Sequence, residues 1–388
     1  MVKDFDYIKP GNVYLDSACQ SLRPRPVIDA LNKYYTEHNS CGERVKYKWG
    51  VETDERVEET REAVLKFLKL SHKDYFVSFT LNTTYGINLL LSQIRTSFVK
   101  KVMTSDIEHN SPFLSTITFA RKNYMKREVM VREDDGSIDV SKYDFSHALV
   151  VINCASNVDG RKLGNMTEVV KAAHKAGGII IIDAAQAMAH MSEMLHKCEA
   201  DAICFSAHKM YAPSLGVMVV RKDMVPKIDT TFIGGGMVDD VELETYDLSA
   251  NSPNHIYTKF ESGLQAWGEI IALGAAIRWL DGLKKEDHQR LEKNVLRLYE
   301  FLRDSPKVVL LNQEPNPTMS FYVEGVDSHL LGAALADDNI MARTGYFCVH
   351  YYLDHVKKYP PLIRFALGYH NSEEDIEKAI AALEKVVK

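Results

Sequence analysis

A lysine and an aspartate each stand at the end of an apolar run in this sequence. Lys209 follows the run DAICFS (201–206), and Asp183 ends the run GIIIID (178–183). Both runs are typical of buried strands, where a carboxylate is costly unless a cation offsets its lost hydration. The separation of Asp183 and Lys209 matches one helix and one strand, so we expect both side chains in one crevice.

Such a pair suits the chemistry of pyridoxal phosphate. A lysine amine forms a Schiff base with the cofactor, and a carboxylate keeps the ring nitrogen protonated so that the ring withdraws electrons. Desolvation lowers the pKa of such a lysine and makes it a usable nucleophile and proton carrier. A plain salt bridge, or two unrelated surface residues, stays open as the alternative for Asp183 and Lys209.

A phosphate group needs donors, and the segment LNTTYGINLLL offers them. Thr83 and Thr84 follow a predicted strand and open a helix, whose free amides and dipole favour an anion. An ordinary threonine cap is the alternative. Ser206 and His208, close to the lysine, can add donors. His109 follows another predicted strand and is placed to stack on a planar ring, unless it is only a loop histidine.

Short apolar runs alternate with helical patterns from about residue 75 to 222. The predicted strands are YFVSFT, KVMTS, ALVVIN, GIIIID, DAICFS and GVMVVR. This alternation predicts an α/β fold, a mostly parallel sheet flanked by helices, with ligands at the strand ends. Further helices are predicted at 26–38, 54–70, 263–283, 286–304 and 372–387, with a strand at 318–325. The part after residue 260 therefore forms a smaller α+β lobe.

The composition narrows the class of protein. The 388 residues are 46% hydrophobic, which suits two lobes, and the net charge of -6 has both signs interspersed. We expect no nucleic-acid partner, no membrane contact and a cytoplasmic protein, since MVKDFDYIKP does not look like a signal peptide. The cysteines show no metal or disulfide spacing and are expected to be reduced and mostly buried. They are Cys19, Cys41, Cys154, Cys198, Cys204 and Cys348.

Three motifs carry a resemblance to a known family. DAAQAMAH, SAHKMYAP and TTYGINLLL resemble the class V aminotransferase family of fold-type I pyridoxal phosphate enzymes, in its cysteine desulfurase and selenocysteine lyase branch. The likeness runs from VYLDSACQSLRPRPVIDAL to RTGYFCVHYYLDHVKKYPPLIRFALGYHNSEEDI. It implies that residues 1–14 pack near the small domain, that 15–260 form the large cofactor-binding domain, and that 261–388 form the small domain with a mobile catalytic loop around Cys348.

The resemblance also implies individual roles. Lys209 would carry the Schiff base, Asp183 would pair with the pyridine nitrogen, and His109 would stack on the ring and assist proton transfer. Further cofactor contacts would come from Thr83, Thr84, Asn157, Gln186, Ser206 and His208, with Gln186 on the ring hydroxyl. The planar fork of Arg364 would bind the substrate carboxylate. Asn157, Arg343 and Arg44 would lie on the substrate side.

In the resembling family a loop cysteine attacks the substrate sulfur, and RTGYFCVH places Cys348 there. Such a cysteine must be exposed and partly ionised, which a loop above a cationic site can provide. The implied cycle leaves alanine and a persulfide on Cys348. One more buried cysteine is the alternative.

Three departures from the family pattern limit what the resemblance implies. Leu264 stands where the branch has a threonine that reaches the partner's phosphate, so Gln265 or a main-chain amide would have to replace it. Glu43 replaces a histidine before Arg44. The loop YFCVHYY lacks the usual histidine before and proline after the cysteine.

The leading hypothesis is a homodimeric cysteine desulfurase that supplies sulfur to an acceptor protein for iron-sulfur cluster or thio-cofactor assembly. A related class V enzyme is the alternative: a selenocysteine lyase, C-S lyase, epimerase or aminotransferase. A scaffold protein without catalysis is a third hypothesis. A nucleotide-binding protein is disfavoured, because no glycine-rich loop follows an early strand.

Overall fold

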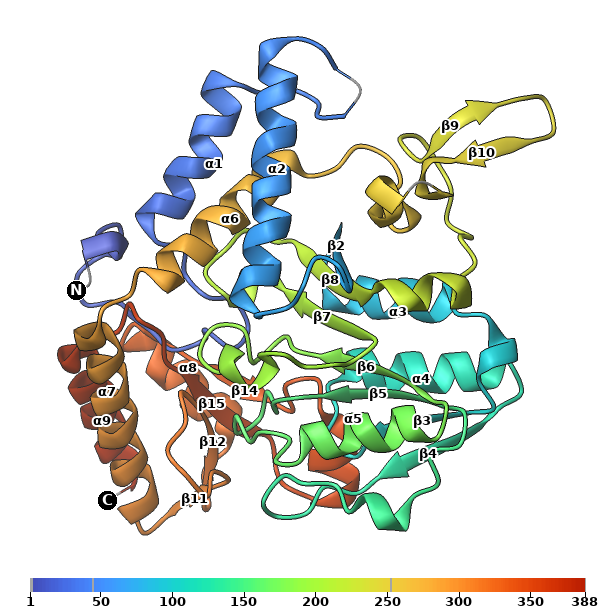
Figure 1. Ribbon diagram of the computed structural model, residues 1–388. Coiled ribbons are helices and arrows are strands. Elements are labelled where there is room, and N and C mark those ends of the chain that lie inside the picture. Colours follow the sequence, from blue (N-terminus) through green and yellow to red (C-terminus); the bar gives the residue numbers. More distant parts are fainter. Residues whose placement is uncertain (1–2, 44, 252, 388) are drawn as a thin grey trace.

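The computed structural model describes residues 3–43, 45–251 and 253–387. Its central element is a seven-stranded sheet with strand order β2-β8-β7-β6-β5-β3-β4 (Figure 1). Strand β8 is antiparallel to both of its neighbours, and the other strands share one direction. The bounds are β2 Tyr75–Thr80, β3 Lys101–Ser105, β4 Lys126–Met130, β5 Ala148–Asn153, β6 Ile179–Asp183, β7 Ala202–Ser206 and β8 Gly216–Arg221. The α/β fold with a mostly parallel sheet is confirmed.

Helices cover both faces of this sheet because its strands are apolar on both sides. In β5, Leu149 and Val151 belong to one core, whereas Val150 and Ile152 belong to the other, as the two-residue period of a strand requires. The first core contains side chains of α3 Thr83–Gln93 and α4 Asn110–Lys122, and the second contains those of α5 Met166–Lys175 and α6 Trp267–Asp281.

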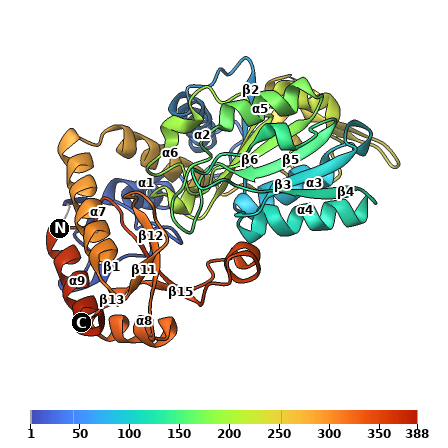
Figure 2. The ribbon, with the colours of Figure 1, turned by 90° about the horizontal axis from the view of Figure 1, so that it is seen from below.

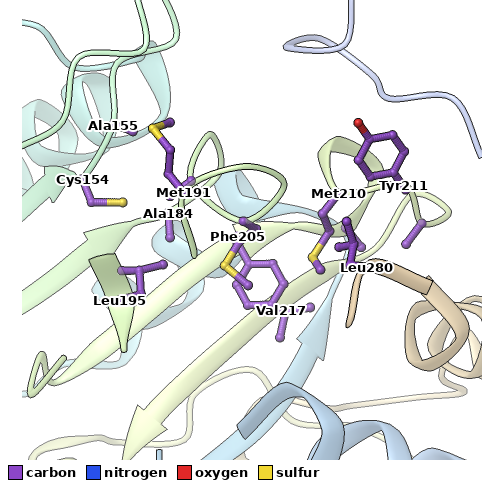
Figure 3. Close-up of a cluster of buried hydrophobic side chains, with 14 of the residues drawn as sticks. Cys154, Ala155, Ala184, Met191, Leu195, Phe205, Met210, Tyr211, Val217 and Leu280 are labelled. Atoms are coloured by element: carbon purple, nitrogen blue, oxygen red, sulfur yellow. The ribbon is translucent and has the colours of Figure 1, made fainter. Parts of the chain in front are cut away.

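The second core reaches the turn that carries the predicted Schiff-base lysine. Figure 3 shows part of it, with Phe205 of β7 and Val217 of β8 near Met210 and Leu280. Phe205 and Met210 are both 0% exposed. Residues on either side of Lys209 are thus held by apolar packing, which fixes the position of the lysine at the end of β7.

A second, antiparallel sheet forms the small lobe (Figure 2). Its strand order is β11-β12-β15-β14, with bounds β11 Val308–Leu310, β12 Thr318–Val323, β14 Arg343–Gly345 and β15 Leu362–Ala366. Helices α7 Lys285–Asp304 and α9 Glu373–Val387 pack together, and α8 Ser328–Asp337 packs on β14 and β15. Strand β1 Val13–Tyr14 pairs in parallel with β13 Ile340–Met341, which brings the N-terminal segment to this lobe.

Helices α1 Arg25–Glu37 and α2 Lys48–Phe67 pack on α6 (Figure 1). The hairpin of β9 Val238–Val241 and β10 Tyr246–Leu248 projects from the body. Since α6 contacts these helices of the large lobe, the division at residue 260 stays a prediction. Within the ranges that the structure describes, no helix is both long and apolar enough to span a bilayer.

Candidate active site

A cavity of about 270 Å³ lies where the carboxyl ends of β2, β6 and β7 face the small lobe. Its walls contain almost every side chain that the sequence placed in a site. These are Thr83, Thr84, His109, Asn157, Asp183, Gln186, Ser206, His208, Lys209, Arg343, Cys348 and Arg364. Groups that are up to 281 residues apart in the sequence, from Thr83 to Arg364, therefore share one cavity.

Asp183 and Lys209 face this cavity without pairing directly. Asp183 is 4% exposed at the end of β6, and its Oδ1 accepts a hydrogen bond from Ala185 N at 2.9 Å. Burial raises the pKa of the Asp183 carboxyl and lowers the pKa of Lys209, whose ammonium the Asp183 charge partly stabilises. Among the described residues the two form no ion pair with each other, so a plain salt bridge does not explain them.

The turn after Lys209 has a strained backbone that other segments hold in place. Tyr211 has a φ of +67°, in the left-handed region that non-glycine residues rarely adopt. Its backbone N donates to Ser21 Oγ at 2.6 Å, and its hydroxyl accepts from Tyr369 N at 3.0 Å. Contacts from both ends of the chain therefore fix the direction in which Lys209 points.

The first turn of α3 forms a cradle of donors. Asn82 caps the helix by accepting from Tyr85 N at 2.9 Å. Thr83 Oγ1 and Ser206 Oγ lie 2.6 Å apart, and Ser206 Oγ also accepts from Thr83 N at 2.9 Å. Thr84 Oγ1 lies 2.6 Å from Ser111 Oγ. The cap is thus Asn82, so the threonine hydroxyls are not needed for capping and can bind an anion at the positive helix end.

His109 is the N-cap of α4, and its ring is fixed by its own helix. Its Nδ1 accepts from Ser111 N at 3.0 Å. Burial lowers the pKa of His109 to about 3, with the Lys209 and Arg364 charges acting in the same direction. The imidazole is therefore neutral near pH 7 and carries its proton on Nε2, which suits ring stacking and proton transfer.

A buried charged group lies directly behind His109 and was missed from the sequence. Glu108 Oε2 accepts from Asn153 N at 2.8 Å, and Glu108 Oε1 accepts from Ser105 Oγ. Arg132 lies 3.7 Å from the same carboxylate. Burial raises the pKa of Glu108 to about 7. These contacts connect the end of β3 to the end of β5. Nothing in the sequence around Glu108 indicated that this glutamate would be buried.

Arg364 lies on β15 and is 3% exposed. Its Nη1 donates to Asn157 O at 3.0 Å, and its Nη2 donates to Asp16 Oδ1 at 3.1 Å. Its Nε is buried and has no partner among the described residues. Arg343 is the register partner of Arg364 across β14 and β15, and its Nη1 lies 3.7 Å from Asp16 Oδ2. Asp16 therefore shares its carboxylate between two guanidinium groups.

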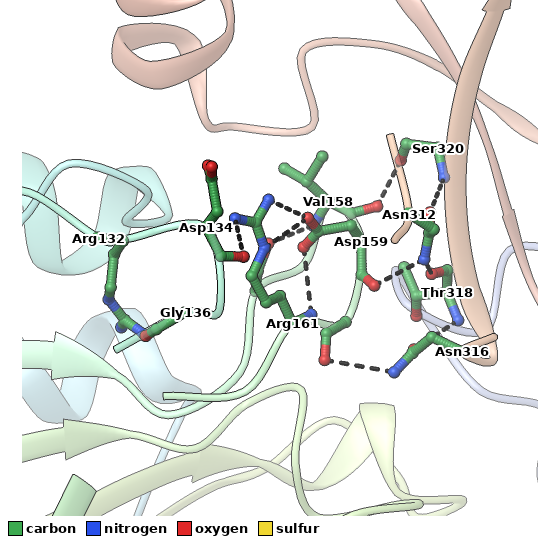
Figure 4. Close-up of polar contacts among 12 residues, drawn as sticks. Arg132, Asp134, Gly136, Val158, Asp159, Arg161, Asn312, Asn316, Thr318 and Ser320 are labelled. Atoms are coloured by element: carbon green, nitrogen blue, oxygen red, sulfur yellow. Dashed lines mark hydrogen bonds and ion pairs between the residues drawn. The ribbon is translucent and has the colours of Figure 1, made fainter. Parts of the chain in front are cut away.

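The loop that carries Asn157 is tied to the small lobe, as Figure 4 shows. Asn312 Nδ2 donates to Asp159 O at 2.8 Å, Ser320 Oγ donates to Val158 O, and Asn316 Nδ2 donates to Gly160 O at 3.3 Å. These bonds join the two lobes next to the cavity. They hold Asn157 in a position where its side chain contacts Phe347 and its carbonyl contacts Arg364.

The Cys348 loop, residues 345–350, is held by the large lobe. Asn157 Nδ2 donates to Phe347 O at 2.7 Å, and Asn110 N donates to Cys348 O at 2.6 Å. Phe347 and Cys348 have φ values of +48° and +59°, so two successive residues are strained. The thiol of Cys348 is exposed and lines the cavity, while Phe347 lies under the Arg364 guanidinium at 4.8 Å.

A six-residue segment, 16–21, crosses the cavity and is called the N-terminal strap below. Ser17 N donates to Ala366 O at 3.1 Å, at the end of β15. Gln186 Nε2 donates to Ala18 O at 2.9 Å, and Ser21 N donates to His208 O at 2.9 Å. The strap therefore joins the arginine side of the cavity to its lysine side.

Two predicted site residues are not found in the cavity. Gln265 donates to Gly263 O at 3.1 Å within its own loop, so the contact predicted for it across a dimer stays a prediction. Arg44 lies outside the described residues. The prediction that the cysteines are mostly buried is confirmed for three of the five other than Cys348, namely Cys154, Cys198 and Cys204. The exceptions are Cys41, which is exposed, and Cys19, which is half-buried.

Sequence reasoning missed several residues of the site. The cavity is also lined by Ala18, Cys19, Asn82, Ser111, Asn153, Ala155, Ala185 and Phe347. Asn82 precedes the predicted Thr83, and Ser111 follows the predicted His109 by two residues. Both lie at the start of a helix, where polar side chains are common, so they could have been predicted from their positions. Cys19 lies in a segment without strand or helix periodicity. Its position in the cavity therefore could not be predicted from the sequence.

Comparison with known proteins shows the family and the fold of this chain. The profile of the aminotransferase class-V family matches residues 13–379. A probable cysteine desulfurase from Pyrococcus abyssi is 28% identical over 97% of this chain and 94% of that protein, and a cysteine desulfurase from Pectobacterium atrosepticum is 27% identical over 96% and 92%. The cysteine desulfurase structure from Thermococcus onnurineus superposes with a TM-score of 0.86 at 28% identity, covering 97% and 94%. The cysteine desulfurase CsdA from Escherichia coli has the same fold, with a TM-score of 0.86 at 21% identity, covering 98% and 96%.

Proposed function

Because the chain belongs to the aminotransferase class-V family, whose cofactor is pyridoxal 5'-phosphate, we propose that it is a cysteine desulfurase. It would convert L-cysteine to L-alanine and place the sulfur on Cys348 as a persulfide. The observation that carries this proposal is that an exposed thiol, Cys348, lines the same cavity as Lys209 and Arg364.

The residues present fit the cofactor. The donors at the first turn of α3 suit its phosphate, and the buried carboxylate of Asp183 suits its ring nitrogen. The half-buried Lys209 has a lowered pKa, which suits covalent attachment to an aldehyde. When bound, the cofactor supplies an electron sink for the carbanion formed at the substrate α-carbon.

The chain's own groups would then bind the substrate and move protons. The guanidinium of Arg364, which lines the cavity, would bind the substrate carboxylate. Asn157 O, which accepts from Arg364 Nη1, would fix the guanidinium plane. Lys209 would carry the α-proton, and neutral His109 would donate or accept at Nε2. The fixed Cys348 loop would hold the thiol over the substrate sulfur.

The test is a comparison of Cys348→Ala with Cys41→Ser as holoenzymes supplied with L-cysteine. Cys41 is the matched control because it is exposed but does not line the cavity. We expect Cys348→Ala to keep the cofactor absorbance, while its rate of alanine formation falls by at least about 100-fold. Cys41→Ser should retain both the absorbance and the rate. Alanine formation that survives in Cys348→Ala would overturn the desulfurase mechanism.

Homodimerisation and delivery to a sulfur-acceptor protein are part of the same proposal. Leu264 is 76% exposed and Leu243, at the tip of the β9–β10 hairpin, is 98% exposed. A partner subunit would cover such side chains in the proposed dimer. In a dimer, Gln265 beside Leu264 would be available to the partner's phosphate. Light scattering of the purified holoenzyme would measure twice the chain mass if this is correct.

A further inference from the structure

The cavity contains a second thiol. Of the six cysteines, Cys19 and Cys348 line it, and the other four do not. Burial raises the pKa of Cys154, Cys198 and Cys204, so these three are poor nucleophiles. Cys19 is half-buried, whereas Cys348 is exposed. The two cavity thiols thus differ in their access to solvent.

The backbone of the N-terminal strap sets the position of Cys19. On one side of Cys19, Asp16 accepts from Arg364 and Ser17 N donates to Ala366 O. On the other side, Ser21 accepts from Tyr211 N and donates to His208 O. Cys19 N itself donates to Asp16 O at 3.0 Å, which closes a turn. Cys19 therefore lies between the arginine that would bind substrate and the lysine that would bind the cofactor.

Both thiols lie in the field of the same cations. Cys19 and Cys348 each interact electrostatically with the Lys209 ammonium, and Cys19 also interacts with the Arg364 guanidinium. Arg364 lines the cavity, and its Nε has no partner among the described residues. Cys19 therefore shares a cavity with two positively charged side chains, Lys209 and Arg364.

We propose that Cys19 is a second sulfur carrier, which takes the sulfane sulfur from a persulfide on Cys348. This inference rests on the proposed function, because that function supplies the persulfide. The Cys19 thiolate attacks the outer sulfur of the Cys348 persulfide, and a new sulfur–sulfur bond forms. The bond between the outer sulfur and Cys348 Sγ breaks, and Cys348 leaves as a thiolate with the electron pair. The proton stays on the outer sulfur, and no oxidant or reductant is consumed.

The exchange has a physical consequence for the sulfur. An exposed persulfide on Cys348 is open to any thiol in solution, whereas one on half-buried Cys19 is shielded by the strap. Regenerated Cys348 is then free to accept sulfur from another substrate molecule. The chain would therefore hold more than one sulfane sulfur when no acceptor is present.

The experiment supplies L-cysteine to the holoenzyme without reductant, stops the reaction with an alkylating reagent and locates sulfane sulfur by peptide mass mapping. Wild type is expected to carry sulfane sulfur on the peptides of both Cys348 and Cys19. Cys19→Ser is expected to carry it on Cys348 alone, and its alanine burst should be about twofold smaller than that of wild type. Cys41→Ser is expected to match wild type in both readings.

Several outcomes separate this inference from the proposed function. A wild-type Cys348 persulfide without any sulfane sulfur on Cys19, together with equal alanine bursts, overturns the second carrier and leaves the desulfurase intact. Sulfane sulfur on Cys19 in Cys348→Ala overturns the transfer, since Cys19 would then react with substrate directly. Alanine formation with sulfane sulfur on neither cysteine overturns the proposed function itself. Mapping of wild type needs no variant, so misfolding of Cys19→Ser cannot obscure the result.

Discussion

The floor of the cavity consists of residues at the ends of the strands of the seven-stranded sheet. Its roof consists of the N-terminal strap, the Cys348 loop and the arginines of β14 and β15. Floor residues such as Asp183 and Ser206 end strands whose backbones are hydrogen-bonded on both sides. Roof residues such as Asp16 and Cys348 are held by a few long-range hydrogen bonds. We infer that the sheet determines which cofactor is bound and that the roof determines what happens to the substrate.

The largest effect is expected on the floor. Lys209→Ala should reduce alanine formation by about 10²–10⁴-fold, because it removes the residue that we propose as both the covalent link to the cofactor and the proton carrier. Lys285→Ala, an exposed lysine at the start of α7, is the control and should behave as wild type. Visible absorbance and borohydride trapping measure the link. A borohydride-trapped adduct that persists in Lys209→Ala would contradict the assignment of Lys209 as the residue that binds the cofactor covalently.

A smaller effect is expected on the roof. Arg364→Lys should raise KM for L-cysteine by about 10–100-fold, because a single ammonium nitrogen lacks the planar fork whose separate nitrogens bond Asn157 and Asp16. The cofactor absorbance should not change. Arg297→Lys is the control, since Arg297 pairs with Glu377 at the surface. A loss of cofactor in Arg364→Lys would mean that floor and roof are not separable.

A third prediction concerns how the free energy of unfolding depends on pH. It involves His370, which follows β15. Its Nε2 donates to Tyr14 O at 2.9 Å, and burial lowers its pKa to about 4 from 6.5. Between these values the unfolded chain binds a proton that the folded chain does not. The free energy of unfolding should therefore fall as pH decreases from 6.5 to 4, by at most about 1.4 kcal/mol per pH unit for this group.

The matched variant for this prediction is His370→Gln, which keeps a donor without the titration. Its free energy of unfolding, measured by urea at a series of pH values, should depend less steeply on pH. His190 and His208, whose pKa values burial lowers to about 4, continue to contribute in the variant. An unchanged slope would show that His370 is not protonated on unfolding in this range.

The smallest effect is expected where roof and floor meet. Ser21→Ala removes the acceptor for Tyr211 N and should lower the free energy of unfolding by about 1–3 kcal/mol, since a buried donor loses its partner. Thr36→Ala, an exposed hydroxyl on α1, is the control. Equal stability of Ser21→Ala and wild type would mean that Tyr211 keeps its strained conformation without the strap.

The floor could be predicted from the sequence because its signals are local. The predicted strand YFVSFT has the same bounds as β2, and the other predicted strands of the seven-stranded sheet agree with the structure to within one residue. Strand β4 of that sheet was not predicted. Continuous apolar runs define such strands, and the polar residue that follows each run defines the site. Asp183, Lys209 and Thr83 were found in this way.

The roof could not be predicted by the same reasoning. The bond from Arg364 to Asp16 spans 348 residues, and the bond from Ser21 to His208 spans 187. No periodicity in SACQS indicates that it lies along a cavity, and β14 and β15 were not predicted as strands. Arg343, Arg364 and Cys348 were assigned only through the family resemblance, because short antiparallel strands and loops carry little local signal.

The pairing of β14 with β15 sets Arg343 directly opposite Arg364. Side chains alternate between the two faces of a strand, so a slip of β14 by one residue would turn Arg343 away and bring Thr344 to the cavity side. The electrostatic potential above a bound amino acid thus depends on strand alignment as well as on residue identity. A single-residue insertion or deletion just before Arg343 is expected to act like the removal of a positive charge.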